Sequence, residues 1–240
     1  MIEWLMASMD PSRSHDLAAS VAWHGRLMVL AWAVLLPLGV IVARFFKITS
    51  RQKWPAELDN KMWWHAHLAL QYTAGISVLI ALVLIWRPRA FGSSWHAWLG
   101  WVVVAACALQ FLSAWLRGTK GGPTDPRPDG SLAGDHYDMT VRRRVFEHLH
   151  KHLGYIAIAF SIAAIGSGLW LVNAPRWMLL VIGLWWLVLI VVWSVLQRRG
   201  RAIDTYQAIW GPDQMHPGNA MLPIGWGVRR LRAKPDGQHE

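Results

Sequence analysis

Five long apolar stretches alternate with short polar segments along the 240-residue chain. The stretches cover residues 21–46, 62–86, 94–117, 145–172 and 176–198. Each is long enough for an α-helix to cross a hydrocarbon core of ~30 Å, which takes ~20 residues. The pattern predicts an all-α integral membrane protein with five transmembrane helices. On this division, residues 1–21 are a short external N-terminal tail, residues 22–198 the transmembrane domain, and residues 199–240 a cytoplasmic C-terminal tail that we expect to be irregular.

The distribution of charge predicts how the helices are oriented. Hydrophobic residues make up 54% of the chain and charged residues only 16%, yet the net charge is +10. Of the 24 Lys and Arg residues, all but five fall on one side of the predicted membrane. The five exceptions are Arg13, Arg26, Arg87, Arg89 and Arg176. Because basic loops stay in the cytoplasm, we expect the N-terminus outside and the C-terminus inside. The membrane is then the plasma membrane, or the inner membrane of a bacterium, and the basic excess does not indicate nucleic-acid binding.

Two segments are expected to depart from straight helix. Pro37 lies in the second half of the first span, where it removes one backbone hydrogen bond and is expected to kink the helix. Neighbouring helices can satisfy the freed carbonyl. Residues 118–138 are rich in Gly, Pro and Asp, which is typical of a turn region without regular structure.

Four histidines, one near the start of each of the first four spans, are the most informative residues: His24, His67, His96 and His150. An ionisable side chain inside a membrane span is costly, and it is rare without a partner or a function. Two of the four have histidine neighbours, which are His65, His148 and His152. Helix geometry puts residues two apart on different faces. His67 and His150 lie on the faces that carry small or polar residues, so we expect these two to point inward.

The alternating directions of the spans pair these histidines. His24 and His96 are expected near the outer face of the membrane, and His67 and His150 near the inner face. Two imidazoles can hold a haem iron from both sides, which leaves no free position for O₂ or substrate and favours electron exchange. We therefore predict that the first four spans form a four-helix bundle core with two iron sites, the outer formed by His24 and His96 and the inner by His67 and His150. The fifth span is expected to complete the packing around this core. No residue is predicted to be catalytic.

Two other interpretations remain open from the residues alone. His148 and His152 share a helix face at the i, i+4 spacing and could bind zinc or copper, but no inward carboxylate or cysteine accompanies them. A non-redox transporter or assembly factor with interfacial histidines is the second. The spans lack inward Asp, Glu, Lys and Arg, which disfavours an ion or proton transporter. The single cysteine, Cys107, allows no covalent haem attachment through a Cys-x-x-Cys-His motif.

The order and spacing of these residues resemble a known family. The first span reads His24-Gly25-Arg26-Leu27-Met28, with Ala31-Trp32 and Leu36-Pro37-Leu38-Gly39 after it. The later spans carry His67 with Gln71, His96 with Gly100 and Gln110, and His150 with Gly154-Tyr155. From residue 23 to residue 172 the chain resembles the transmembrane core of the eukaryotic-type cytochrome b561 family, in the form found with DOMON domains.

The resemblance implies a cofactor and an activity. It implies two haem b groups whose axial ligands are the four selected histidines, and an oxidoreductase that transfers electrons across a membrane. In this family the donor is typically a cytoplasmic reductant such as ascorbate and the acceptor lies outside; a membrane quinol is the alternative donor. The expected partners are membrane lipid and a small-molecule or protein donor and acceptor. The sequence leaves a homodimer open.

Overall fold

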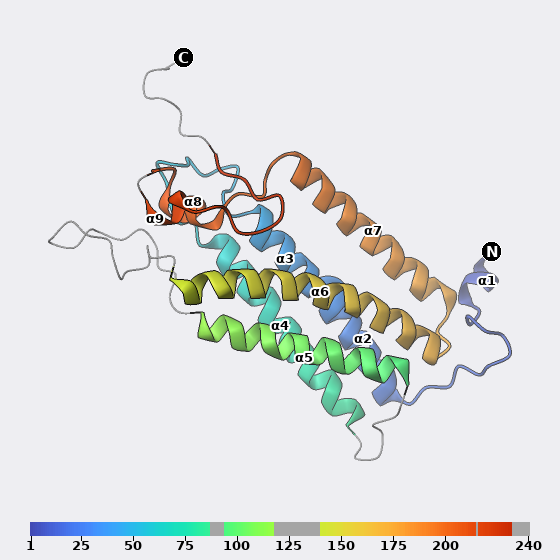
Figure 1. Cartoon of the computed structure of the whole chain (residues 1–240). Coiled ribbons are helices and arrows are strands. Elements are labelled where there is room, and N and C mark those ends of the chain that lie inside the picture. The colour runs from blue at the N-terminus through green and yellow to red at the C-terminus, as the bar shows by residue number, and fades with distance from the viewer. Residues whose placement is uncertain (87–93, 118–139, 215, 232–240) are drawn as a thin grey trace.

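The computed structural model describes residues 1–86, 94–117, 140–214 and 216–231 (Figure 1). Within these ranges, five helical segments are long and apolar enough to cross a membrane. The first combines α2 (Ala19–Val29), η1 (Leu30–Leu35) and α3 (Leu36–Phe45). The other four are α4 (Met62–Ile85), α5 (Trp95–Leu116), α6 (Val141–Leu171) and α7 (Arg176–Arg198). The prediction of an all-α, multi-pass membrane protein is confirmed. The loop expected at residues 118–138 lies outside the described residues.

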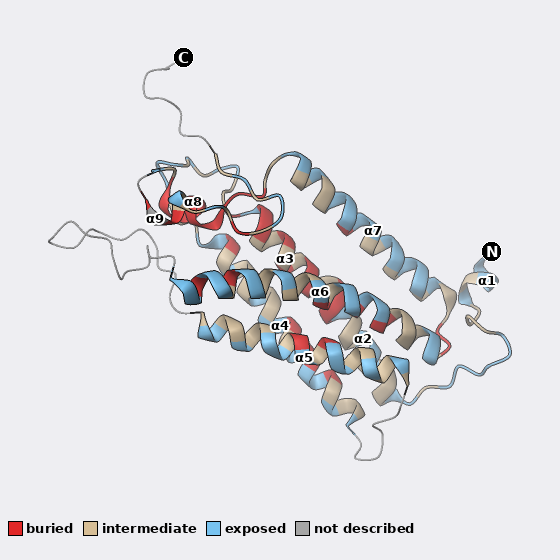
Figure 2. Cartoon of the chain, in the orientation of Figure 1, coloured by how far each residue is buried: buried red, intermediate tan, exposed pale blue. Residues whose placement is uncertain are grey.

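Successive spans run in alternating directions, and the first four form the bundle (Figure 1). The first span packs on α4, and α5 packs on α6; α7 lies against α3 at the edge of the bundle. The buried residues at the centre are mostly small, including Ala31, Ala74, Ala106 and Ala157. Figure 2 shows that the outward faces of the helices are exposed. Small residues inside and large apolar residues outside are the arrangement that close helix packing in lipid requires.

The first span contains a π-helical segment, η1, which ends two residues before Pro37. Proline has no N–H, so the carbonyl of Ala33, four residues earlier, loses its helical partner. Trp185 of α7 supplies one, because its indole Nε1 donates to the Ala33 carbonyl at 2.8 Å. A neighbouring helix thus satisfies the freed carbonyl, as expected, and this bond ties α7 to the bundle.

The N-terminal tail is fastened to the turn between α6 and α7. Asn173 in that turn is only 1% exposed and has a left-handed backbone with φ of 49°. Its side chain accepts a hydrogen bond from the Asp10 amide at 2.9 Å and donates to the Arg13 carbonyl at 2.7 Å. Helix α1 (Ile2–Met6), which precedes this contact, lies beside the start of α7. The tail therefore covers this end of the bundle.

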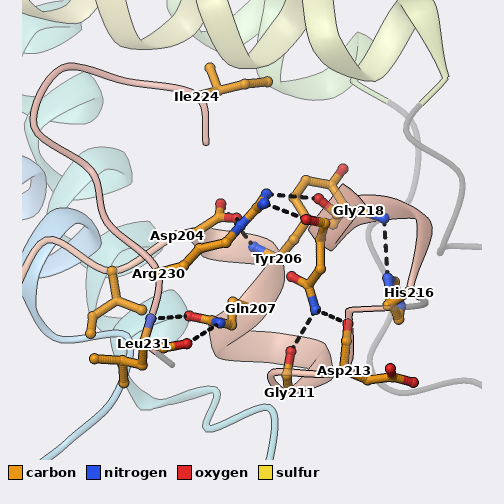
Figure 3. Close-up of polar contacts among 12 residues, drawn as sticks. Asp204, Tyr206, Gln207, Gly211, Asp213, His216, Gly218, Ile224, Arg230 and Leu231 are labelled. Carbon is orange, nitrogen blue, oxygen red and sulfur yellow. Dashed lines mark hydrogen bonds and ion pairs between the residues drawn. The ribbon is translucent and has the colours of Figure 1, made fainter. Parts of the chain in front are cut away.

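The segment after α7 is folded, so the expectation of an irregular tail is wrong for residues 200–231, which we call the cap. The cap contains α8 (Thr205–Trp210) and α9 (Pro217–Ala220), and residues 202–211 are all buried. Asp204 begins α8 and binds the Arg230 guanidinium at 2.8 Å (Figure 3). Gln207 exchanges two hydrogen bonds of 2.7 Å with the Leu231 backbone. These partners lie more than twenty positions apart in the chain, a relation that hydropathy does not reveal.

The bond from Trp185 to Ala33 gives a first prediction. The substitution Trp185→Phe keeps an aromatic ring but leaves the Ala33 carbonyl without a donor. We expect it to destabilise the protein by about 1 kcal/mol in detergent unfolding, the usual scale for one interhelical hydrogen bond in a membrane. Trp186→Phe is the control, since the neighbouring Trp186 indole makes no side-chain hydrogen bond among the residues that the structure describes. Equal stability of the two variants would contradict the role of this bond.

Candidate functional site

The four histidines selected from the sequence meet as two pairs. His24 of α2 and His96 of α5 have ring centres 6.3 Å apart, with their planes at 89°. His67 of α4 and His150 of α6 have ring centres 6.4 Å apart, with their planes at 76°. We call the first the tail-side pair and the second the cap-side pair, after the segments at the same ends of the bundle.

Backbone carbonyls of neighbouring spans orient three of the four imidazoles. The Nδ1 atoms of His24, His67 and His96 each lie 3.0 Å from a carbonyl oxygen. The carbonyls belong to Ala81, Gly39 and Ala164, respectively. A carbonyl only accepts hydrogen bonds, so Nδ1 carries the proton in each case and Nε2 keeps its lone pair. This is the arrangement in which histidine binds a metal through Nε2.

The histidines set aside on sequence grounds point elsewhere. His65, His148 and His152 are exposed, whereas the four members of the pairs are half-buried. The rings of His148 and His152 stack at 6.1 Å between centres on the outer face of α6. Among the described residues there is no group of three or more His, Cys, Asp or Glu side chains that could hold a metal ion. Among the described residues, therefore, no third side chain joins His148 and His152 to form a zinc or copper site.

Glycines lie close to the pairs and set the space around them. A Cβ built on Gly168 of α6 would come within 2.9 Å of the His96 ring, so this ring needs a glycine opposite it. A Cβ on Gly100, one turn beyond His96, would meet no atom within 4 Å. The same is true of Gly25, next to His24. The tail-side pair is thus held tightly on one side and has open space on the other.

A large cavity surrounds the cap-side pair. Its volume is about 200 Å³, and both His67 and His150 line it. Much of the wall is apolar, with side chains such as Trp32, Leu68 and Phe111. Gln110 also lines it and donates a hydrogen bond of 2.8 Å to the His150 carbonyl. A mostly apolar cavity with a few convergent polar groups is typical of a cofactor site.

The spacing within both pairs fits an iron ion between two imidazoles. Two metal–nitrogen bonds of about 2 Å each, together with the offset of each nitrogen from its ring centre, add up to roughly 6 Å. The ring separations are 6.3 and 6.4 Å. Nε2 donors, open space beside Gly100 and the cavity at His67 and His150 together suit a flat macrocycle at each pair.

Several residues near the cap-side cavity were missed or explained otherwise from the sequence. Trp32 is 5% exposed and its Nε1 finds no acceptor among the described residues, although it lines the cavity. Glu147 is 5% exposed and also lines the cavity, so the expectation that the spans carry no inward charged residue is wrong at this end of the bundle. Arg44, which charge asymmetry explains as a cytoplasmic flank, is buried and donates to the Tyr155 hydroxyl at 3.0 Å and to the Trp226 carbonyl. The sequence did contain a signal for Arg44 and Glu147, because both are ionisable residues that lie just inside the ends of predicted spans.

Comparison with known proteins identifies the class. The family model described as eukaryotic cytochrome b561 matches residues 23–119, which include His24, His67 and His96. A cytochrome b561, DM13 and DOMON domain-containing protein of Arabidopsis thaliana is 26% identical over 194 residues, 78% of this chain and 19% of that protein. Ferric-chelate reductase 1 of Bos taurus is 30% identical over 150 residues, 61% of this chain and 22% of that protein. No solved structure matches the chain.

The structure is that of a helical, multi-pass membrane protein, and the similarities are to cytochrome b561 proteins and ferric-chelate reductases. The chain is supported as a member of the cytochrome b561 family, as its residues suggested, by the family model and by the relatives that carry that name. It spans about a fifth to a third of the length of the curated relatives that it matches. The family implies binding of haem b, and with the reductases among the relatives it supports transmembrane electron transfer in general.

The contact between Gly168 and His96 leads to a second prediction. The Gly168→Ala methyl group would overlap the imidazole and push it from its position. We expect the purified variant to hold less haem per protein than the unmodified chain. Gly166→Ala is the matched control, two positions away on the same helix, where a Cβ meets nothing within 4 Å. Full haem content in Gly168→Ala would show that the His96 position is not needed for haem binding.

Proposed function

We propose that this protein carries electrons across the membrane through two bis-histidine haem b groups, one at each histidine pair. The observation that supports this most strongly is the recurrence of one geometry at both ends of the bundle, with ring separations of 6.3 and 6.4 Å. Electrons enter from a cytoplasmic or membrane donor, such as ascorbate or a quinol. They leave to an acceptor outside.

The protein's residues orient the haem ligands and leave no coordination position for other molecules; they do not themselves make or break bonds. A bound haem would supply a reversible one-electron couple. With a histidine on each face, the iron would have no free coordination position, so donors and acceptors exchange electrons without binding to the metal. The carbonyls of Ala81, Gly39 and Ala164 hold the imidazoles of His24, His67 and His96 in one tautomer. Fixed ligands change little when the iron changes charge.

Charge asymmetry supports the orientation that we propose. A basic stretch, Arg198, Arg199 and Arg201, joins the end of α7 to the cap. Such residues favour the cytoplasm. The cap-side pair is then the inner site, and the tail-side pair the outer site, in a plasma membrane or a bacterial inner membrane. Relatives named ferric-chelate reductase suggest chelated ferric iron as one class of external acceptor.

A non-redox transporter is the alternative function. The middle sections of the five spans, residues 30–43, 68–85, 99–116, 153–171 and 177–197, contain no Asp, Glu, Lys or Arg. A transporter of ions or protons needs such groups along its path. The observation therefore favours electron transfer.

Removing single histidines tests the sites and their pairing together. We expect the unmodified protein to bind two low-spin haem b per chain. His24→Ala and His96→Ala should each lose one haem and leave the same remaining spectrum and midpoint potential. His67→Ala and His150→Ala should also lose one haem, but should share a different remaining potential.

The neighbouring histidines serve as matched controls for this experiment. His65→Ala and His148→Ala remove exposed imidazoles two positions from His67 and His150, and we expect both to retain two haems. A colourless unmodified protein would refute the proposed function. Equivalent behaviour of His24→Ala and His67→Ala would refute the pairing.

A further inference from the structure

The charged side chains that line the cap-side cavity are strongly unbalanced. Five are cations, and a single carboxylate, Glu147, accompanies them within the described lining. The cations are Arg44, Lys47, Arg117, Arg143 and Lys151. A mostly apolar wall weakens screening by water, so each of these charges acts strongly on any redox centre in the cavity. Glu147 is therefore the group that opposes the positive potential there.

Glu147 is held in one position by two ion pairs. It is 5% exposed and lies on α6, three residues before His150. One carboxylate oxygen is 2.7 Å from an Arg143 guanidinium nitrogen, and the other is 2.8 Å from the Lys151 ammonium. Arg143 lies four residues before Glu147 and Lys151 four residues after it, so one helix face presents the whole triad.

The cap also contacts this triad, through Lys151. The Lys151 ammonium donates a hydrogen bond of 2.9 Å to the Ile224 carbonyl. Glu147 and Lys151 also line a small polar pocket beneath the cap, together with Tyr206 and Arg230. Burial raises the pKa of Tyr206 to about 12, so this phenol adds no charge at neutral pH. Beneath the cap, the charge next to Glu147 is therefore that of Arg143 and Lys151, its ion-pair partners.

We propose that Glu147 is a positioning residue that sets the reduction potential of the cap-side site, by placing one fixed negative charge beside His150 in an otherwise cationic cavity. This inference rests on the proposed function, since it needs a haem at the cap-side pair. A negative charge favours the oxidised, more positive iron, so Glu147 lowers the potential of this site relative to a cavity without it. The residue touches no reacting group and acts through the field at the site.

Potentiometric titration of purified protein with two variants of opposite charge tests the proposal. Glu147→Gln removes the negative charge and should make the cap-side potential more positive. Lys151→Gln removes a positive charge, keeps a donor for Ile224, and should make the same potential more negative. Loss of a unit charge within one helical turn of an axial residue, at an effective dielectric near 20, changes a reduction equilibrium constant on the order of tenfold.

Damage to the fold does not produce shifts of opposite sign, which makes the pair of variants diagnostic. The tail-side potential should stay unchanged in both. Glu57→Gln is the matched control, because Glu57 lies in the exposed segment between α3 and α4 and does not line the cavity. Unchanged cap-side potentials, or shifts of the same sign in both variants, would overturn the inference. Absence of haem from the unmodified protein would instead overturn the proposed function.

Discussion

A histidine inside a membrane span must have a partner, and the structure depends on how that requirement is met. For His24, His67 and His96 the partner of Nδ1 is a backbone carbonyl of another span. Each bond joins two helices and at the same time fixes the tautomer that leaves Nε2 available. The contacts that hold the bundle together are therefore also the contacts that prepare the sites. A change in helix packing would move the imidazoles with it.

The five spans and the inward histidines could be predicted because both depend on local patterns. Hydropathy marks a span within a few residues, and helix geometry separates His67 from His65 by face alone. The cap could not be predicted in this way. Its buried residues depend on Asp204 binding Arg230 and on Gln207 binding the Leu231 backbone, and neither pairing has a periodic signature. Glu147 was missed for a related reason: its partners Arg143 and Lys151 lie four residues away on either side, but only the folded bundle shows that Glu147 faces the cavity beside the cap-side pair.

The two ends of the molecule differ in ways that suit different tasks. At the tail-side end, Gly168 brings α6 against the His96 ring and Asn173 fastens the N-terminal tail. At the cap-side end, the histidine pair opens into a charged cavity covered by a folded segment. The triad on α6 links that cavity to the cap through Lys151. A change in the cap would thus alter the charged groups next to the cap-side pair, the proposed point of electron entry, and would leave the tail-side pair unaffected.

Electron transfer across a sealed membrane tests the central claim most directly. Purified protein would be reconstituted into vesicles with ascorbate trapped inside and ferricyanide, which does not cross the bilayer, outside. Reduction of the haem by ascorbate in detergent confirms beforehand that this donor is competent. The account predicts loss of the ferricyanide absorbance that depends on the protein and on trapped ascorbate. Haem that becomes fully reduced in the vesicles while external ferricyanide stays oxidised would contradict it.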